Sequence, residues 1–152
     1  MIENGCPFCD LALFRAADVC IENDFCVFAT TRDPRDPPDL LPGCGLIVPI
    51  AHRPSVFDFT ADEWAATREL LLSAKEALDE RLAPDGYLLA WNAFPPAGDE
   101  ALFHAHLHVV PRFDDEPLAA EGARSAIKVP GNRRPDPFGR GNGRAQLLGP
   151  RA

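Results

Sequence analysis

Apolar residues gather in short runs along this chain, and each run has the length of a strand. The runs at residues 25–30, 45–50 and 87–92 are rich in β-branched, aromatic or leucine side chains and are typical of buried strands. A fourth run, residues 103–112, alternates between histidine and apolar residues and ends near Pro111. Such alternation predicts a strand with two chemically different faces.

One long helix is predicted by the pattern that follows residue 59. Thr60 and Glu63 have the spacing of a capping box, and Phe59 just before them is placed to act as a hydrophobic staple. An apolar stripe then recurs at helical intervals and is made of Trp64, Leu71, Ala74, Leu78 and Leu82. Pro84 ends the helical pattern.

Helical and strand patterns occupy separate stretches of the chain, which favours the α+β class. A short N-terminal helix is predicted after Pro7, and the long helix is expected to pack on an antiparallel sheet of about five strands. We expect residues 1–113 to form one domain. Residues 114–152, rich in proline, glycine and arginine, are expected to form a C-terminal extension.

Charge is distributed unevenly over the 152 residues, whose net charge is −8. From residue 120 onward seven basic and two acidic residues give a balance of about +5, which leaves about −13 for the rest. An acidic body argues against a nucleic-acid duplex as the ligand, because phosphate backbones require basic surfaces. No apolar run is long enough to span a membrane. The first residues lack the layout of a signal peptide, so we expect a cytoplasmic protein.

Five cysteines in a chain without an export signal favour free thiols or metal ligands over disulfides. Cys6 and Cys9 form a Cys-x-x-Cys pair, which suits a zinc site, although a redox pair has the same spacing. A closed tetrahedral site needs two further ligands. His52, just after a predicted strand, and His104 are the candidates.

Three of the four histidines, at positions 104, 106 and 108, alternate along the fourth predicted strand. In a strand they share one face at intervals of about 6.6 Å, and the apolar residues between them face the long helix. Imidazole acts as a ligand, a base or a nucleophile near neutral pH. If His52 and His104 bind a metal, His106 and His108 remain for chemistry.

The stretch "HAHLHVV" matches the motif of the histidine triad (HIT) family, in which histidines alternate with apolar residues. "CPFCD", "PGCGLIVPIAH", Asn92 and "VVPR" also resemble that family, so the likeness covers roughly residues 5–113. It implies the HIT fold, a homodimer, and a purine nucleotide substrate cleaved or transferred at the α-phosphate. It further implies a covalent nucleotidyl-histidine formed on His106.

The same resemblance assigns roles to the other histidines and to a metal. His108 would stabilise charge on the phosphate, and His104 would be the structural member of the catalytic triad. In zinc-carrying branches the ligands map onto Cys6, Cys9, His52 and His104, which implies a structural zinc ion.

The loop before the triad departs from the family pattern. Asn92 resembles the family's polar residue that contacts the ribose or phosphate, whereas Gly98 lies one residue farther from the triad than the family pattern has its glycine. Glu100 and Ala101 stand where the family has glutamine and a hydroxyl residue. We interpret all four as substrate-binding candidates, and Glu100 either as an acid for the leaving group or as a carboxylate that repels a polyphosphate.

Two other classes remain open from the sequence. A zinc-dependent hydrolase or oxygenase would use the alternating histidines as catalytic ligands, but no Asp or Glu adjoins the histidine run to complete such a site. A non-catalytic nucleotide-binding or scaffolding protein would keep the same fold. The intact triad argues against this class, whereas the altered loop leaves it open.

Overall fold

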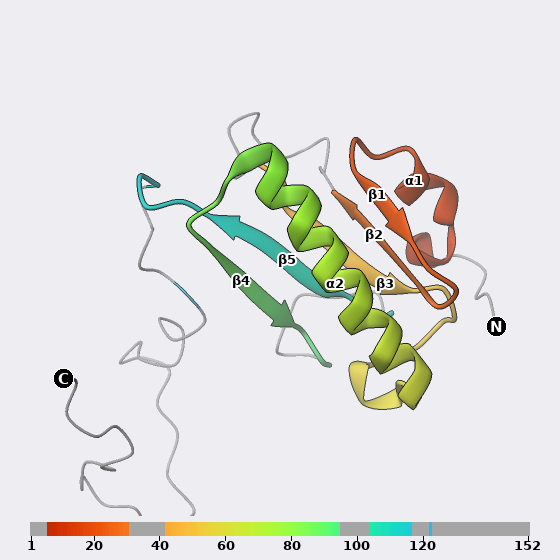
Figure 1. Ribbon diagram of the computed structural model, residues 1–152. Helices are drawn as coiled ribbons and strands as arrows, with labels where there is room; N and C mark the ends of the chain where they lie inside the picture. Colours follow the sequence, from red (N-terminus) through yellow and green to blue (C-terminus); the bar gives the residue numbers. More distant parts are fainter. Residues whose placement is uncertain (1–5, 31–41, 95–103, 117–121, 123–152) are drawn as a thin grey trace, which may run out of the picture. The chain divides into compact units, whose positions relative to one another are not determined.

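The structure is a computed structural model that describes residues 6–30, 42–94, 104–116 and 122 (Figure 1). The chain divides into two units, residues 1–120 and 121–152. All of the helices and strands described below belong to the first unit.

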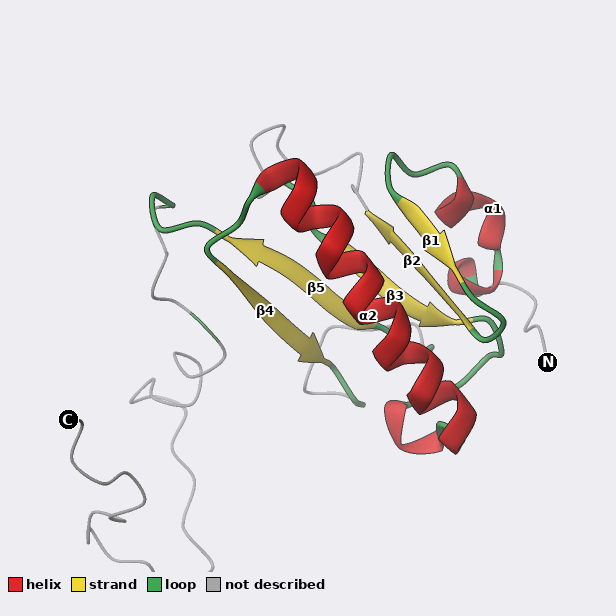
Figure 2. Cartoon of the chain, viewed as in Figure 1, coloured by secondary structure: helices red, strands yellow, loops and turns green. Residues whose placement is uncertain are grey.

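Five strands form one antiparallel sheet, as Figure 2 shows, which confirms the predicted α+β class. They are β1 (Cys20–Glu22), β2 (Cys26–Thr30), β3 (Gly45–Pro49), β4 (Gly86–Trp91) and β5 (Leu107–Arg112). Their order across the sheet is β1-β2-β3-β5-β4, so β5 lies between β3 and β4 and carries the end of the histidine run.

Within the residues that the structure describes, four helical segments accompany the sheet: η1 (Pro7–Cys9), α1 (Leu11–Arg15), η2 (Val56–Asp58) and α2 (Ala61–Leu82). The predicted N-terminal helix is thus split into a 3₁₀ turn and a separate short helix. Asp10 separates the two segments because its backbone is not helical. Its side chain accepts a hydrogen bond from the Ala12 amide and so caps the start of α1.

Helix α2 begins as the sequence predicts. The Thr60 hydroxyl accepts from the Glu63 amide at 3.2 Å, and the Glu63 carboxylate accepts from the Thr60 amide at 2.8 Å, which completes the capping box. Phe59 packs on Trp64 with ring centroids 5.5 Å apart, so the predicted hydrophobic staple is also present.

One face of the sheet is covered by α2 (Figure 1). The buried helix residues are Ala66, Leu70, Ala74 and Leu78, and the sheet supplies Cys26, Phe28, Ile47, Leu107 and Val109. This confirms for Leu107 and Val109 that the apolar residues of the histidine run face the long helix, whereas Ala105 is buried outside this cluster. The predicted stripe is wrong in part, because Trp64 is 48% exposed and Leu71 is only partly buried. A row of residues four apart, with two alanines that permit close approach, makes the contact instead.

The opposite face of the sheet is covered by the N-terminal segment. Phe14 of α1 is buried in a second cluster with Val27, Ala29, Leu46 and Val48. Because residues opposite each other in neighbouring strands point to the same face, His108, which pairs with Leu46, lies on this face. The two faces of β5 therefore meet different elements. No helix in the described part of the chain has the length and hydropathy required to span a membrane.

The core can be tested on α2, where a buried leucine and an exposed one lie six positions apart. Leu78 is buried in the main cluster, whereas Leu72 is largely exposed. We expect Leu78→Ala to lower the free energy of unfolding by about 2–5 kcal/mol. Leu72→Ala should change it by less than about 0.5 kcal/mol. Urea unfolding of both variants measures the difference, and equal losses would contradict the described packing of α2.

Candidate active site and metal centre

The histidine run enters the sheet later than predicted. Strand β5 begins at Leu107, so only His108 lies within the ladder, opposite Leu46 of β3 and Ala90 of β4. The physical reason is Pro49, which would lie opposite Ala105 if the register continued and which has no amide hydrogen to donate. The Ala105 amide instead donates to the Arg53 carbonyl at 2.7 Å.

His104 lies outside the backbone pairing of the sheet, and a hydrogen bond from its side chain holds it in place. Its imidazole is 1% exposed, and Nε2 lies 3.0 Å from the Pro49 carbonyl oxygen. A carbonyl only accepts, so Nε2 carries the proton and Nδ1 presents its lone pair. That lone pair faces the cysteine pair, with Nδ1 3.3 Å from Cys6 Sγ and 3.6 Å from Cys9 Sγ.

Four predicted ligands converge at this point. The ligand atoms of Cys6, Cys9, His52 and His104 all lie within 4.8 Å of one another, and His52 Nδ1 is 3.4 Å from Cys9 Sγ. A tetrahedral ion with Zn–S and Zn–N bonds of about 2.3 and 2.0–2.1 Å separates sulfur from nitrogen by about 3.5–3.6 Å. The three sulfur–nitrogen distances given above, 3.3, 3.4 and 3.6 Å, match that geometry to within a few tenths of an ångström. The four residues can therefore hold a metal ion, with the most distant ligand atoms drawn closer together around it.

Burial sets the protonation of the cluster. The pKa of His104 falls from 6.5 to about 4, chiefly through burial and also through the neighbouring His52 and His106, while the bond to Pro49 opposes the shift. The imidazole is therefore neutral at physiological pH, the state in which it binds metal. Burial also raises the pKa of the Cys6 thiol, so that metal binding would release its proton.

His106, the predicted nucleophile, is also fixed in one tautomer. Its ring is 5% exposed, and Nδ1 donates to the His104 carbonyl oxygen at 2.9 Å. Nε2 of the neutral ring then carries the lone pair. The imidazole of His108 lies beside it, with ring centroids 4.8 Å apart, which agrees with the predicted common face of these two histidines.

Phe8 packs against the second core cluster and also contacts the histidines, a contact that the sequence did not predict. Its ring contacts His106 edge-on, with centroids 5.0 Å apart, and it also packs on His104 and Phe14. Its position between Cys6 and Cys9 was the available signal, because a turn that brings both thiols to His104 also brings the intervening side chain to the histidines.

Asn92 directly follows Trp91, the last residue of β4, which pairs with Leu107. Asn92 and His106 are the next residues beyond that pair on the two chain segments. Asn92, the predicted substrate contact, is therefore at the same end of the sheet as the histidines. The other substrate-binding candidates, Gly98, Glu100 and Ala101, lie outside the described residues.

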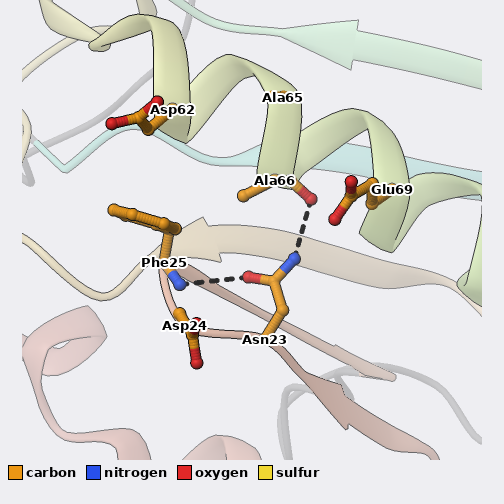
Figure 3. A pocket seen from close by; sticks show the side chains of 7 residues that line it. All are labelled: Asn23, Asp24, Phe25, Asp62, Ala65, Ala66 and Glu69. Carbon is orange, nitrogen blue, oxygen red and sulfur yellow. Dashed lines mark hydrogen bonds between the residues drawn. The ribbon is translucent and has the colours of Figure 1, made fainter.

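A cavity of about 320 Å³ lies between the β1–β2 turn and α2 (Figure 3). Its lining residues are Asn23, Asp24, Phe25, Asp62, Ala65, Ala66 and Glu69, which include none of the predicted site residues. Three of the seven are carboxylates, and their charge opposes the binding of a phosphate group. The cavity therefore does not suit a phosphate-bearing ligand.

Arg53 and Glu63 were also missed as site residues. Arg53 follows His52 in sequence and joins the histidine segment to the start of α2, because its Nε donates to both carboxylate oxygens of Glu63. The sequence had indicated Glu63 only as half of a capping box.

Comparisons with known proteins agree with this geometry. The family model of the HIT domain matches residues 15–115, more than half of the chain. Adenylylsulfatase HINT3 of Arabidopsis thaliana is 28% identical over 127 residues, which are 81% of this chain. The chain spans 60% of the length of that relative.

Solved structures share the fold. SMU.412c from Streptococcus mutans UA159 superposes with a TM-score of 0.61 at 24% identity, over 76% of this chain and 71% of that one. A Zn-bound histidine triad family protein from Mycobacterium smegmatis has a TM-score of 0.59 at 26% identity, over 75% and 79% of the two chains.

Proposed function

This chain belongs to the HIT domain family, and on that premise we propose that it is a nucleotide hydrolase or nucleotidyl transferase. The proposed reaction occurs at the α-phosphate of a dinucleoside polyphosphate or a nucleoside phosphoramidate, through a covalent nucleotidyl-histidine. The observation that carries the proposal is the tautomer of His106, whose Nδ1 donates to the His104 carbonyl and leaves the Nε2 lone pair for attack.

The reaction proceeds in two displacements. Nε2 of His106 attacks the α-phosphorus, so that a P–N bond forms while the bond to the leaving group breaks and its electron pair departs with that group. Water, or another acceptor in a transfer, then attacks the same phosphorus. The P–N electron pair returns to Nε2, and the nucleoside monophosphate is released.

His108 is proposed to donate a hydrogen bond to a non-bridging oxygen of the α-phosphate, where negative charge develops in the transition state. The support is its place beside His106 on the same face. Asn92, Gly98, Glu100 and Ala101 are proposed substrate contacts, with a purine nucleoside as the bound half of the substrate. Glu100, as a carboxylate, would select among leaving groups by charge or by proton donation.

We also propose that the metal cluster holds a structural zinc ion. The donor set of two cysteines and two histidines is a closed tetrahedral set. The zinc-bound Mycobacterium smegmatis protein is a neighbour of the same fold. The described cluster includes neither His106 nor His108, which weighs against the alternative of a metalloenzyme that uses the alternating histidines as catalytic ligands.

A homodimer paired edge to edge is proposed for the assembly. In the described sheet β4 is an edge strand, and an unpaired edge is a template for a second chain. Apolar side chains surround it, because Leu89 of β4 is 46% exposed and Trp64 packs on Trp91 with a half-exposed ring. A second copy would bury this apolar surface.

The nucleophile is tested by release of AMP from diadenosine tetraphosphate and adenosine 5′-phosphoramidate. The name of the Arabidopsis thaliana relative adds adenylylsulfate to the panel. We expect His106→Ala to lower turnover by about 10³-fold or more while AMP still binds, because the covalent step is lost. Mass spectrometry of rapidly quenched wild-type protein should find one nucleotidyl group on His106.

Retained turnover in His106→Ala would contradict the proposed mechanism. Binding of AMP without cleavage of any of the three substrates by the wild type would favour the non-catalytic class instead. The same panel applied to Glu100→Gln examines the leaving group, since an unchanged order of substrates would remove the proposed role of Glu100.

The metal proposal is tested by elemental analysis. We expect about one zinc per chain in the wild type and a loss of most of it in Cys9→Ser, because one thiolate ligand is removed. Cys20→Ser is the matched control, since Cys20 lies outside the cluster, and it should keep its zinc. Well under one zinc per chain in the wild type, or equal zinc in both variants, would exclude the proposed site.

The assembly is tested by light scattering. The wild type should have twice the chain mass of 16.6 kDa. Leu89→Arg should be monomeric, because it places a charge at the proposed edge. Leu13→Arg, a control on α1 at a leucine that is more exposed than Leu89, should remain a dimer. A monomeric wild type, or dissociation by both substitutions, would refute β4 as the interface.

A further inference from the structure

We propose that the ion pair between Arg53 and Glu63 is a positioning device for the nucleophile, holding the segment that carries His106 against the start of α2. This inference rests on the proposed function, which assigns His106 the attacking nitrogen. Arg53 and Glu63 are positioning residues, because they act on His106 through the backbone at Ala105.

The nucleophile lies just outside the sheet. The ladder with β3 and β4 ends at Leu107, one residue after His106. On the other side of His106 the Ala105 amide donates to the Arg53 carbonyl at 2.7 Å. The position of the Arg53 backbone therefore determines the position of the residue that immediately precedes the nucleophile.

The Arg53 side chain fixes that backbone to α2. Nε lies 2.8 Å from Oε1 and 3.0 Å from Oε2 of Glu63, so one N–H is shared between both oxygens. Glu63 is only 2% exposed, and its Oε2 also accepts from the Thr60 amide at 2.8 Å. A buried carboxylate held by two partners has little freedom, whereas the Arg53 side chain is one-third exposed.

The helix start to which Arg53 is anchored is itself fixed to the sheet. Asn23, in the turn between β1 and β2, donates to the Ala66 carbonyl at 2.9 Å, as Figure 3 shows, and Ala66 is buried in the main cluster. The connection therefore runs from the sheet through the first turns of α2 to Glu63, Arg53, Ala105 and His106.

Glu63 remains charged in its buried place. Burial by itself raises the pKa of the carboxyl group, but hydrogen bonds from the Thr60 amide and from Arg53 outweigh it and hold the pKa below its usual value. A buried ion pair contributes less to net stability than to a defined geometry, because desolvation offsets much of the attraction. Defined geometry is what an attacking nitrogen requires, since a misplacement of about 1 Å can cost about 10²-fold in rate.

Two substitutions in the same capping box separate positioning from stability. Glu63→Gln keeps an oxygen that can accept from the Thr60 amide but loses the charge that holds Arg53. Thr60→Ala removes the hydroxyl that caps the Glu63 amide and leaves the ion pair intact. Both should lower the urea midpoint of unfolding, which makes Thr60→Ala the matched control.

We expect Glu63→Gln to lower kcat by about 10- to 100-fold with KM within about threefold, because the nucleophile is displaced and not the bound nucleotide. Thr60→Ala should keep kcat within about twofold. The second measurement is hydrogen exchange of the Ala105 amide, which should become about tenfold faster in Glu63→Gln and stay unchanged in Thr60→Ala. Arg53→Lys, which keeps the cation, should give values between those of wild type and Glu63→Gln.

Equal effects of Glu63→Gln and Thr60→Ala on kcat and on Ala105 exchange would overturn the proposal. If Glu63→Gln does not fold, Arg53→Lys compared with Thr60→Ala decides the question in the same way. Failure of the proposed function has a different signature, because His106→Ala would then retain turnover or the wild type would show none. The exchange of the Ala105 amide would still report whether the ion pair holds the segment.

Discussion

The carbonyl of Pro49 is free to accept a side chain because the ladder between β3 and β5 ends before it. The Ile50 amide donates to Phe25 on the β2 side, so the alternation of a strand turns the Pro49 carbonyl toward β5. In a continued ladder it would accept from the Ala105 amide, but here it accepts from Nε2 of His104. That hydrogen bond sets the tautomer of His104 and buries its ring.

Two functions converge on His104 as a result. Its Nδ1 faces the cysteines, and its carbonyl oxygen accepts from Nδ1 of His106. A metal bound by the side chain would thus steady the residue whose backbone fixes the tautomer of His106, the proposed nucleophile. Phe8 adds a second link, since it lies between the two cysteines and its ring packs against His106. The candidate metal ligands and the proposed catalytic histidines therefore form one connected structure.

The sequence correctly predicted features whose interacting residues lie close together along the chain. The capping box of Thr60 and Glu63 and the staple of Phe59 were correctly predicted, because their partners lie within five residues. The four candidate metal ligands could be predicted as a set because the Cys-x-x-Cys spacing indicated two of them and the family resemblance implied the two histidines. The start of β5 could not be predicted, since it depends on which residue of β3 would pair with Ala105 if the ladder continued, and that residue is Pro49. The choice of Leu70 over Leu71 on α2 likewise depends on where the helix crosses the sheet.

The histidines alternate with apolar residues although only His108 belongs to the ladder. Alternation keeps the rings of His106 and His108 on one side of the chain, with centroids 4.8 Å apart, whether or not the backbone is paired. Leaving the ladder frees the Ala105 amide for Arg53 and the Pro49 carbonyl for His104. A fully paired strand would keep the alternation but lose both contacts. Both contacts therefore require that the ladder between β3 and β5 ends before Ala105.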